Sequence, residues 1–399
     1  KLNPALLRLQ EYPFERLKKL LEPVSTNSKF KSIKFSVGEP RHKPPEFVLQ
    51  ALSRARNDLG HYPTIKGSNT LRVTAAGWLE NRYNLTSGSI DPDTQILPVN
   101  GTREGIFSFT QACINPKNTP LVVTCNPFYQ IYEGAAILAG AELWYLDCHE
   151  DNHFLPDLSM VPAKIWERCQ ILHFCSPGNP TGSCIGIDQM CLALQLAEKY
   201  DFIIVSDECY SEIYFDETSP PIGLLDACKI VGNNEFKRSI IFHSLSKRSN
   251  LPGLRSGCVS GDRALIEQFL LYRTYHGCAM SPATQAASIA AWRDESHVIA
   301  NRKNYREKFE KVTAILQPTL EFFVPRASFY LWPKTPIDDV KFCRDLYQSK
   351  NVTVLPGQYM GRTTSSGNPG TNRIRMALVA ELDDCIEAAE RIINYVEGL

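Results

Sequence analysis

Lys247 lies among residues whose types and spacing suit covalent chemistry. It follows the apolar run Ile240–Phe242, which predicts a buried strand, and it therefore lies just past the carboxyl end of that strand. Open α/β sheets bind their ligands at this edge. Ser244 and Ser246 precede the lysine, and Arg255 follows eight residues later. A lysine amine is a good nucleophile in a water-poor pocket beside other cations, and the neighbouring groups suit a phosphate; an exposed loop lysine is the alternative.

Polar groups also follow two other apolar, strand-like runs. Asn179 lies in the turn Ser176–Gly182, where two prolines and two glycines fix the backbone and present the amide side chain. Asp207 follows the run 202–206, and Tyr210 comes three residues later. A carboxylate at a buried strand end is costly unless a cation meets it, and a protonated pyridine nitrogen is such a cation. A solvated aspartate at the end of a strand is the alternative.

Two further strand ends carry groups that suit a flat, phosphorylated ligand. Gly101 and Thr102 lie between a strand and an apolar helix, where a glycine turn and a helix N-terminus offer N–H groups to a phosphate. An ordinary capped helix would explain the same residues. Tyr129 follows the strand-like run 121–125. Its ring could stack on an aromatic ligand or could belong to the core.

The pattern S-x-S-K-x(7)-R-x-G around Lys247 and the P-x-N-P-T-G turn around Asn179 resemble the signatures of the class I (fold type I) aminotransferases. These enzymes depend on pyridoxal 5'-phosphate (PLP). In order and spacing, the resemblance covers nearly the whole chain. It implies that Lys247 binds PLP covalently and moves a proton during catalysis. It also implies that Asp207 meets the ring nitrogen and that Tyr210 donates to the phenolic oxygen as the third catalytic residue.

The same resemblance implies the other contacts to cofactor and substrate. The predicted cofactor-binding residues are Tyr62, Gly101, Thr102, Arg103, Tyr129, Asn179, Asp207, Tyr210, Ser244, Ser246, Lys247 and Arg255. The predicted substrate-binding residues are Gly38, Asn179 and Arg375. Of these, Arg375 would hold the α-carboxylate through its bidentate fork, and Gly38 would offer a backbone N–H. Arg373, two residues earlier on the same strand face, is the alternative to Arg375.

Four stretches resemble, more narrowly, the bacterial N-succinyl-L,L-diaminopimelate aminotransferases: Tyr12–Leu17, Asn126–Glu133, Ser206–Glu217 and Leu271–Pro282. This resemblance implies a succinyldiaminopimelate transaminase of lysine biosynthesis that uses 2-oxoglutarate. The alternatives are an aminotransferase for N-acetylornithine, aspartate or an aromatic amino acid, and a PLP-dependent C–S lyase or decarboxylase on the same fold. Arg41 and Arg273 are candidates for binding the distal succinyl carboxylate, although each could instead form a salt bridge at the rim.

Strand-like runs alternate with helical stretches and predict an α/β fold. The runs are 95–99, 121–125, 142–147, 171–175, 202–206, 239–243 and 256–260. Four are almost continuously apolar, as strands covered on both faces are. We therefore expect a mainly parallel sheet of about seven strands, wrapped by helices. The expected parts are an N-terminal arm with part of the small domain at 1–45, a large PLP-binding domain at 46–284 and a small α+β domain at 285–399.

Composition restricts the partners of the chain. Its 43 basic and 43 acidic residues leave no positive surplus that would favour nucleic acid or an anionic membrane. No apolar run approaches the length of a membrane span, and the absence of a signal peptide favours a cytoplasmic enzyme. The 13 cysteines include no C-x-x-C pair and are expected in the core. The H-E-x-x-H match at His149–His153 is followed by Pro156, so a turn is expected there, and no metal.

A homodimer with shared active sites is also expected. Tyr62 and the segment Tyr272–Ser281 resemble regions of the family that complete the neighbouring subunit's site, with Tyr62 at the partner's cofactor phosphate. His276, within that segment, is expected to line a substrate channel, with a structural histidine as the alternative. The other expected partners are small amino acid and 2-oxo acid substrates.

Overall fold

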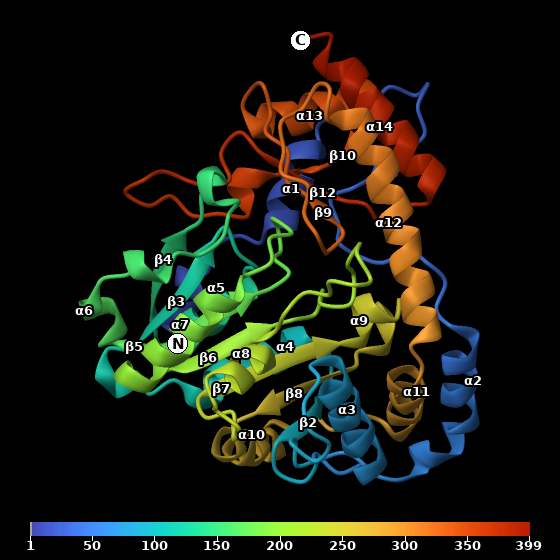
Figure 1. Ribbon diagram of the computed structural model, residues 1–399. Helices are drawn as coiled ribbons and strands as arrows, with labels where there is room; N and C mark the ends of the chain where they lie inside the picture. Colours follow the sequence, from blue (N-terminus) through green and yellow to red (C-terminus); the bar gives the residue numbers. More distant parts are fainter. Residues whose placement is uncertain (1) are drawn as a thin grey trace.

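A seven-stranded sheet is the centre of the computed structural model, which describes residues 2–399 (Figure 1). In spatial order its strands are β2 (Ile96–Val99), β8 (Gly257–Gly261), β7 (Ser239–Ser244), β6 (Ile203–Asp207), β5 (Cys169–Cys175), β3 (Leu121–Asn126) and β4 (Glu142–Asp147). Strands β3 to β7 are parallel, whereas β8 is antiparallel to both of its neighbours. The predicted α/β fold, with a mainly parallel sheet of seven strands, is confirmed.

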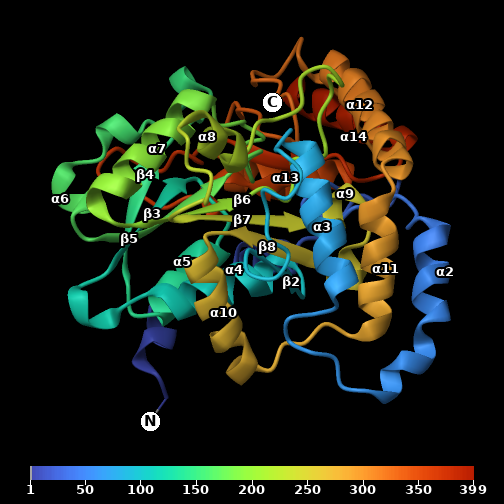
Figure 2. The ribbon, with the colours of Figure 1, turned by 60° about the horizontal axis from the view of Figure 1, so that its bottom comes forward.

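Helices cover both faces of this sheet, which explains the continuously apolar strands. Figure 2 shows α7 and α8 over one face and α4, α5 and α10 over the other. In β7, Ile240 and Phe242 belong to the core that includes Phe109 of α4, whereas Ile241 belongs to the core that includes Met190 of α7. Because successive side chains point to opposite faces, both faces need apolar residues.

The helices around the large sheet are α2 (Glu46–Arg54), α3 (Asn69–Arg82), α4 (Thr102–Cys113), α5 (Ile131–Leu138), α6 (Ala163–Trp166), α7 (Ile187–Tyr200), α8 (Leu224–Ile230), α9 (Leu245–Arg248), α10 (Arg263–His276) and α11 (Pro282–Arg293). Short 3-10 helices lie at Pro4–Arg8, Arg56–Gly60, Pro116–Asn118, Glu150–Asn152, Leu158–Met160, Pro252–Leu254 and Gly357–Tyr359. Helix α9 carries Lys247 and begins directly after β7. The strand therefore positions the lysine at its carboxyl end.

A second group of elements has its own core. Its helices are α1 (Pro13–Leu21), α12 (Ser296–Leu316), α13 (Asp339–Lys350) and α14 (Leu382–Val396), and its strands are β1 (Ile33–Lys34), β9 (Tyr330–Leu331), β10 (Val352–Thr353), β11 (Leu355–Pro356) and β12 (Ile374–Ala377). Strand β1 pairs in parallel with β10, and β11–β12–β9 form an antiparallel sheet. The N-terminal segment thus joins C-terminal strands. The division at 1–45, 46–284 and 285–399 stays a prediction.

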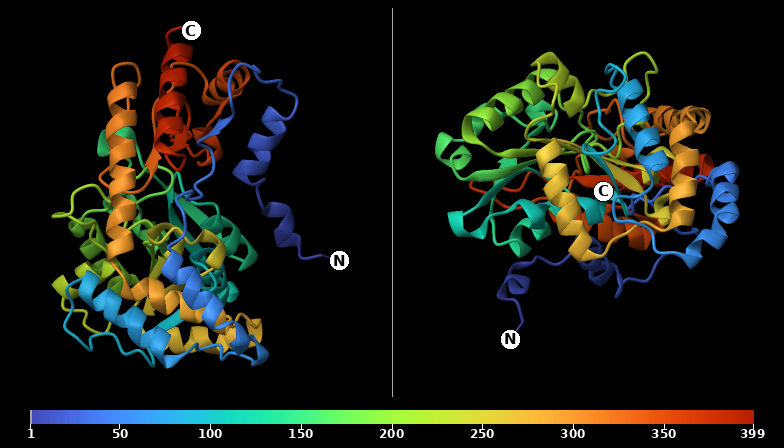
Figure 3. Two further views of the ribbon diagram at one scale, coloured as in Figure 1. Left: turned by 90° about the vertical axis from the view of Figure 1, so that its right-hand side faces the viewer. Right: turned by 90° about the horizontal axis from the view of Figure 1, so that it is seen from below.

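One long helix connects the two groups of elements, and the start of the chain extends away from both. Helix α12 extends from the region beside α11 to α14 in the second group (Figure 1), and the start of the chain projects from the body (Figure 3). Within residues 2–399, none of the helices combines the length and the apolar character needed to cross a membrane.

Candidate active site

The predicted site residues meet around one cavity of about 480 Å³ at the carboxyl ends of β5, β6 and β7. The residues of the predicted set that line it are Gly38, Thr102, Arg103, Tyr129, Asn179, Asp207, Tyr210, Ser244, Ser246, Lys247, Arg255 and Arg375. Gly101 lies directly beneath Arg255 without lining the cavity. Tyr62 is fully exposed and does not line it. The structure therefore brings most of the set together, while the roles of the residues stay a prediction.

Lys247 has the environment of a reactive amine. Its Nζ donates a hydrogen bond to the carbonyl oxygen of Gly38 and lies 5.3 Å from the ring centre of Phe329. Burial, helped by the nearby Arg375 and Arg255, lowers the pKa of Lys247 to about 8. A substantial fraction of the amine is therefore neutral near that pH, as nucleophilic attack requires.

Asp207 is a buried carboxylate whose partners are hydrogen-bond donors. Only 2% of the residue is exposed. Tyr132 Oη donates to Oδ2 at 2.9 Å, and the backbone N–H of Cys209 donates to Oδ1 at 3.3 Å. Burial raises the pKa of Asp207 despite these two donors. Within residues 2–399 the carboxylate has no ion-pair partner. A cationic ring nitrogen in the cavity would therefore offset the cost of burying its charge.

The start of α4 and the loop after α9 form a donor-rich corner. Gly101, the residue before the helix, has φ 87° and provides no side-chain cap, so N–H groups of the first turn are available. The Arg255 guanidinium packs so closely on Gly101 that a Cβ there would collide with it. Ser244 and Ser246 line the same cavity. These donors suit a phosphate. Together with Lys247 and Asp207, they fit PLP.

Arg375 is a buried cation with only neutral partners. It is 3% exposed; its Nη1 donates to Asn179 Oδ1 at 2.8 Å and its Nη2 to the Ser36 carbonyl at 2.6 Å. Its Nε has no partner in the structure. Arg373, the alternative from the sequence, instead forms an ion pair with Glu150 at 2.6 Å and does not line the cavity. Arg375 is therefore the arginine of this strand that can meet a carboxylate.

Sequence reasoning missed three tyrosines at the site: Tyr12 and Tyr330, which line the cavity, and Tyr132, which lies behind Asp207. Tyr132, three residues past Tyr129, bonds Asp207, and its place in the first turn of α5 after a strand was the available signal. Tyr330 shares a hydrogen bond of 2.8 Å with Tyr210 through their hydroxyls. No local pattern marks Tyr330, because the contact joins segments 120 residues apart.

Three other candidates lie outside the cavity. Arg273 is 1% exposed and forms an ion pair with Glu104 at 2.5 Å, so it is not free to bind a distal carboxylate. Arg41 and His276 are exposed and do not line the cavity. By contrast, Arg103 lines it, and its Nε donates to the Tyr129 hydroxyl at 2.7 Å.

Two clusters of possible metal ligands do not form convincing sites. His149–His153 form a turn around the 3-10 helix Glu150–Asn152, as predicted, and not the α-helix that an H-E-x-x-H zinc site requires. Glu104, His276 and Cys278 have ligand atoms within 4.8 Å of one another. Both oxygens of Glu104, however, already accept hydrogen bonds, from Arg273 and from the backbone N–H of Asn100. We therefore assign no metal to either group.

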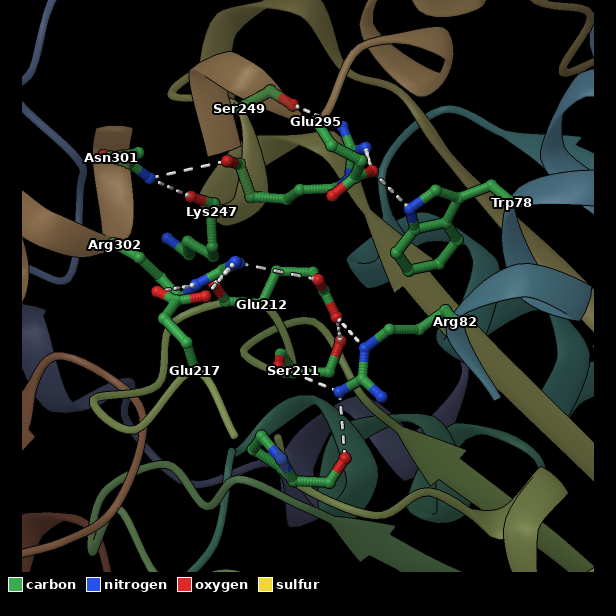
Figure 4. Close-up of polar contacts among 12 residues, drawn as sticks. Trp78, Arg82, Ser211, Glu212, Glu217, Lys247, Ser249, Glu295, Asn301 and Arg302 are labelled. Carbon is green, nitrogen blue, oxygen red and sulfur yellow. Dashed lines mark hydrogen bonds and ion pairs between the residues drawn. The ribbon is translucent and has the colours of Figure 1, made fainter. Parts of the chain in front are cut away.

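A buried polar network lies behind Lys247 (Figure 4). The side-chain amide of Asn301 donates to the carbonyl oxygens of Lys247 at 3.2 Å and Arg248 at 3.4 Å. Glu212, two residues past Tyr210, accepts from Arg82 Nε at 2.6 Å and lies 3.8 Å from an Arg302 nitrogen. These contacts attach the backbone of the site to α3 and α12.

Comparisons with known proteins agree with this geometry. The family model "Aminotransferase class I and II" matches residues 31–392. An LL-diaminopimelate aminotransferase of Nitratidesulfovibrio vulgaris is 30% identical over 99% of both chains. An aminotransferase structure from Neisseria meningitidis has a TM-score of 0.94 and 45% identity, over 99% of this chain and 100% of that one. A probable N-succinyldiaminopimelate aminotransferase from Thermus thermophilus has a TM-score of 0.85 and 27% identity, over 97% and 100%.

The lowered pKa of Lys247 predicts a distinctive labelling profile in protein freed of cofactor. Because only the neutral amine reacts, acetylation of Lys247 by acetic anhydride should be half-maximal near pH 8, the value to which burial lowers its pKa. Exposed lysines of the same sample serve as the internal control and should react at higher pH. Mass spectrometry of peptides gives both profiles. Coincident profiles for Lys247 and the exposed lysines would contradict the prediction.

Proposed function

This chain belongs to the aminotransferase class I and II family, and from that premise we propose that it exchanges an amino group between N-succinyl-L,L-diaminopimelate and 2-oxoglutarate in lysine biosynthesis. PLP is its cofactor, and small amino acids and 2-oxo acids are its substrates. The choice among such substrates is the proposed part. It depends on the charges that line the cavity. Action in the cytoplasm stays a prediction.

The residues of the cavity divide the work of amino transfer. Bound PLP supplies a ring that accepts the electron pair left when the substrate α-proton departs. Lys247 would hold the cofactor covalently, and its amine would move a proton at the substrate α-carbon. Asp207, oriented by Tyr132, holds a proton at the ring nitrogen. Arg375 and Asn179 bind the α-carboxylate and fix the direction from which the amine approaches.

The substrate proposal rests on one observation, namely that Arg103 lines the cavity with only neutral hydrogen-bond partners. In this scheme the other three cations of the cavity have partners: Lys247 the cofactor aldehyde, Arg255 the phosphate and Arg375 the α-carboxylate. Arg103 lines the same cavity, yet its hydrogen-bond partners are the neutral hydroxyls of Tyr129 and Tyr12. We therefore move Arg103 from the predicted cofactor set to the distal carboxylate of the substrate.

Free L,L-diaminopimelate is the second candidate, since relatives such as the Nitratidesulfovibrio enzyme are named for it. Its far end carries an ammonium beside the carboxylate, whereas a succinyl arm ends in a carboxylate alone. An ammonium close to Arg103 would be repelled. The unneutralised guanidinium thus favours the succinylated compound, in accord with the name of the Thermus structure. N-acetylornithine reacts through its δ-amine, because its α-amine is acetylated, so it has no carboxylate beside the reacting carbon for Arg375 to bind.

A substrate panel tests this assignment. We expect kcat/KM for N-succinyl-L,L-diaminopimelate to exceed that for free L,L-diaminopimelate, N-acetylornithine and aspartate, with 2-oxoglutarate as the acceptor. A preference of about tenfold for any of the other three, some 1.4 kcal/mol of transition-state binding, would refute the assignment and leave the family membership intact.

Removing the charge of Arg103 should affect the distal carboxylate selectively. In Arg103→Gln we expect kcat/KM for the succinylated substrate to fall about ten- to a hundredfold, since a hydrogen bond between charged groups contributes roughly 1.5–3 kcal/mol. Activity with an aromatic amino acid, which has no second carboxylate, should change much less. Arg54→Gln is the matched control, because Arg54 is exposed at the end of α2 and outside the cavity. If kcat/KM fell equally for both substrates in Arg103→Gln, the guanidinium would not bind the distal carboxylate.

A homodimer with shared sites is proposed on the exposure of aromatic and apolar side chains. Tyr62 is fully exposed, Tyr275 is 87% exposed and Leu271 is 54% exposed. Such groups favour a protein partner over water, and Tyr62 lies away from the cavity of its own chain. The proposal places Tyr62 at the cofactor phosphate of the neighbouring subunit.

Mixing two defective chains tests this arrangement. A hybrid of Lys247→Ala and Tyr62→Ala chains contains one site with both native residues, so a statistical mixture should regain about a quarter of the wild-type activity. Each variant mixed with itself is the control. If hybrids form, as native mass spectrometry can show, and the mixture gains nothing, Tyr62 does not act across the interface.

A further inference from the structure

The segment from Ser36 to Pro45, which we call the Gly38 strap, touches two of the cations in the cavity. The carbonyl oxygen of Ser36 accepts from Arg375 Nη2 at 2.6 Å, and that of Gly38 accepts from Lys247 Nζ. Val37, Gly38 and Glu39 line the cavity. The position of the strap therefore affects where a substrate carboxylate can bind.

Few bonds hold this strap. Pro40, Pro44 and Pro45 have no N–H to donate, and from residue 37 to residue 44, all of which the structure describes, the backbone bonds the rest of the chain only through the Gly38 carbonyl. In the same stretch, His42 provides the side-chain hydrogen bonds. With so few hydrogen bonds, the position of the segment depends on packing, such as that of Gly38 against Tyr330, and on the contacts of His42.

The hydrogen atoms around His42 can be assigned from its neighbour Asn301. The Asn301 Nδ2 donates to the carbonyl oxygens of Lys247 and Arg248, as Figure 4 shows, so its Oδ1 is the acceptor. That oxygen accepts from Asn250 Nδ2 at 2.9 Å and lies 2.8 Å from His42 Nδ1. His42 Nδ1 therefore carries a hydrogen. In a neutral ring, Nε2 is then a bare acceptor.

The partner of His42 Nε2 is a buried lysine. Lys308 Nζ lies 2.7 Å from it, and Lys308 is 2% exposed. No ion pair of Lys308 is found within residues 2–399. Burial lowers the pKa of Lys308, while Glu381 and Cys385 raise it. The neutral imidazole of His42 is thus the acceptor that a buried ammonium needs.

The other groups that face His42 leave this charge pattern unchanged. Its ring packs on Tyr305, with 4.7 Å between ring centres. Burial is the largest cause that lowers the pKa of His42, and the charge of Lys308 lowers it further. The hydrogen bond with Asn301 and the charge of Glu381 act in the opposite direction, and the net direction is downward.

We propose that His42 is a positioning residue that fixes the Gly38 strap only while its ring is neutral, so that protonation releases the strap and weakens binding of the substrate carboxylate. A protonated ring directs a second N–H at the Lys308 ammonium, and two cations at that separation repel each other. Because the pKa of His42 in the folded chain lies below the ordinary 6.5, the strap is held above that pH. It loosens as the pH falls from there through the lowered pKa. This effect of His42 on the strap does not depend on which amino acid is the substrate.

A titration of histidine resonances tests the charge relation directly. Holoenzyme labelled with ¹³C at the histidine Cε1 is titrated by NMR, and the signal absent from His42→Gln identifies His42. We expect a midpoint below pH 6.5, and an upward shift in Lys308→Met, which removes the neighbouring charge while keeping an apolar chain of similar length. A wild-type midpoint at or above 6.5, or no shift in a folded Lys308→Met or Lys308→Gln variant, overturns the proposal.

The pH dependence of KM distinguishes release of the strap from a general structural effect of the substitution. With L-glutamate as amino donor, the wild-type KM should rise below pH 6.5 by up to about tenfold per pH unit, with kcat less affected. His42→Gln keeps a donor and an acceptor but cannot titrate, so this rise should disappear. His149→Gln, at an exposed histidine outside the cavity, is the matched control. A KM raised equally at every pH in His42→Gln would show a merely structural role. If glutamate is not a donor at all, the proposed function fails and the NMR titration still decides the role of His42.

Discussion

A carboxylate buried without a counter-charge is the constraint on which this site depends. Taking an ionised group out of water costs several kcal/mol when nothing compensates it. Asp207 accepts hydrogen bonds from Tyr132 and from the backbone of Cys209, and Tyr132 stacks on His173 with 4.8 Å between ring centres. Burial lowers the pKa of His173 to about 3, so this histidine is neutral and brings no charge. Tyr132 and the backbone of Cys209 thus orient the carboxylate, and no ion pair within residues 2–399 neutralises it.

The rest of the cavity has the opposite imbalance. Arg375 and Arg103 have only neutral partners, and Arg255 lies beside an uncapped helix start. Each of these groups is satisfied by an anion, whether a phosphate or a carboxylate. A zwitterionic cofactor would bring a cationic nitrogen to Asp207 and a phosphate to the donors of the cavity. An acidic substrate would neutralise the remaining arginines. Because binding to the folded state alone stabilises it by mass action, the occupied enzyme should be the more stable form.

Features that depend on residues close together in the sequence could be predicted, whereas contacts between distant residues could not. The strands and the polar residues at their ends were predictable, because apolar runs and turn residues act within a few positions. The partners of long charged side chains were not. Arg273 meets Glu104 across 169 positions, and His42 meets Lys308 across 266. Nothing local distinguishes the buried, neutralised Arg273 from Arg103, which lines the cavity with neutral partners.

The two groups of elements meet through a connected set of aromatic and polar contacts. The Gly38 backbone packs so tightly on Tyr330 that a side chain there would collide with the Tyr330 hydroxyl. That hydroxyl in turn bonds Tyr210, on the loop after β6. Glu212 ties the same loop to Arg82 of α3. Buried ion pairs of this kind add little net stability, yet losing one partner is costly, so they act mainly to fix geometry. Through Tyr330, the Gly38 strap is therefore in contact with Tyr210, and the two groups of elements meet at the cavity.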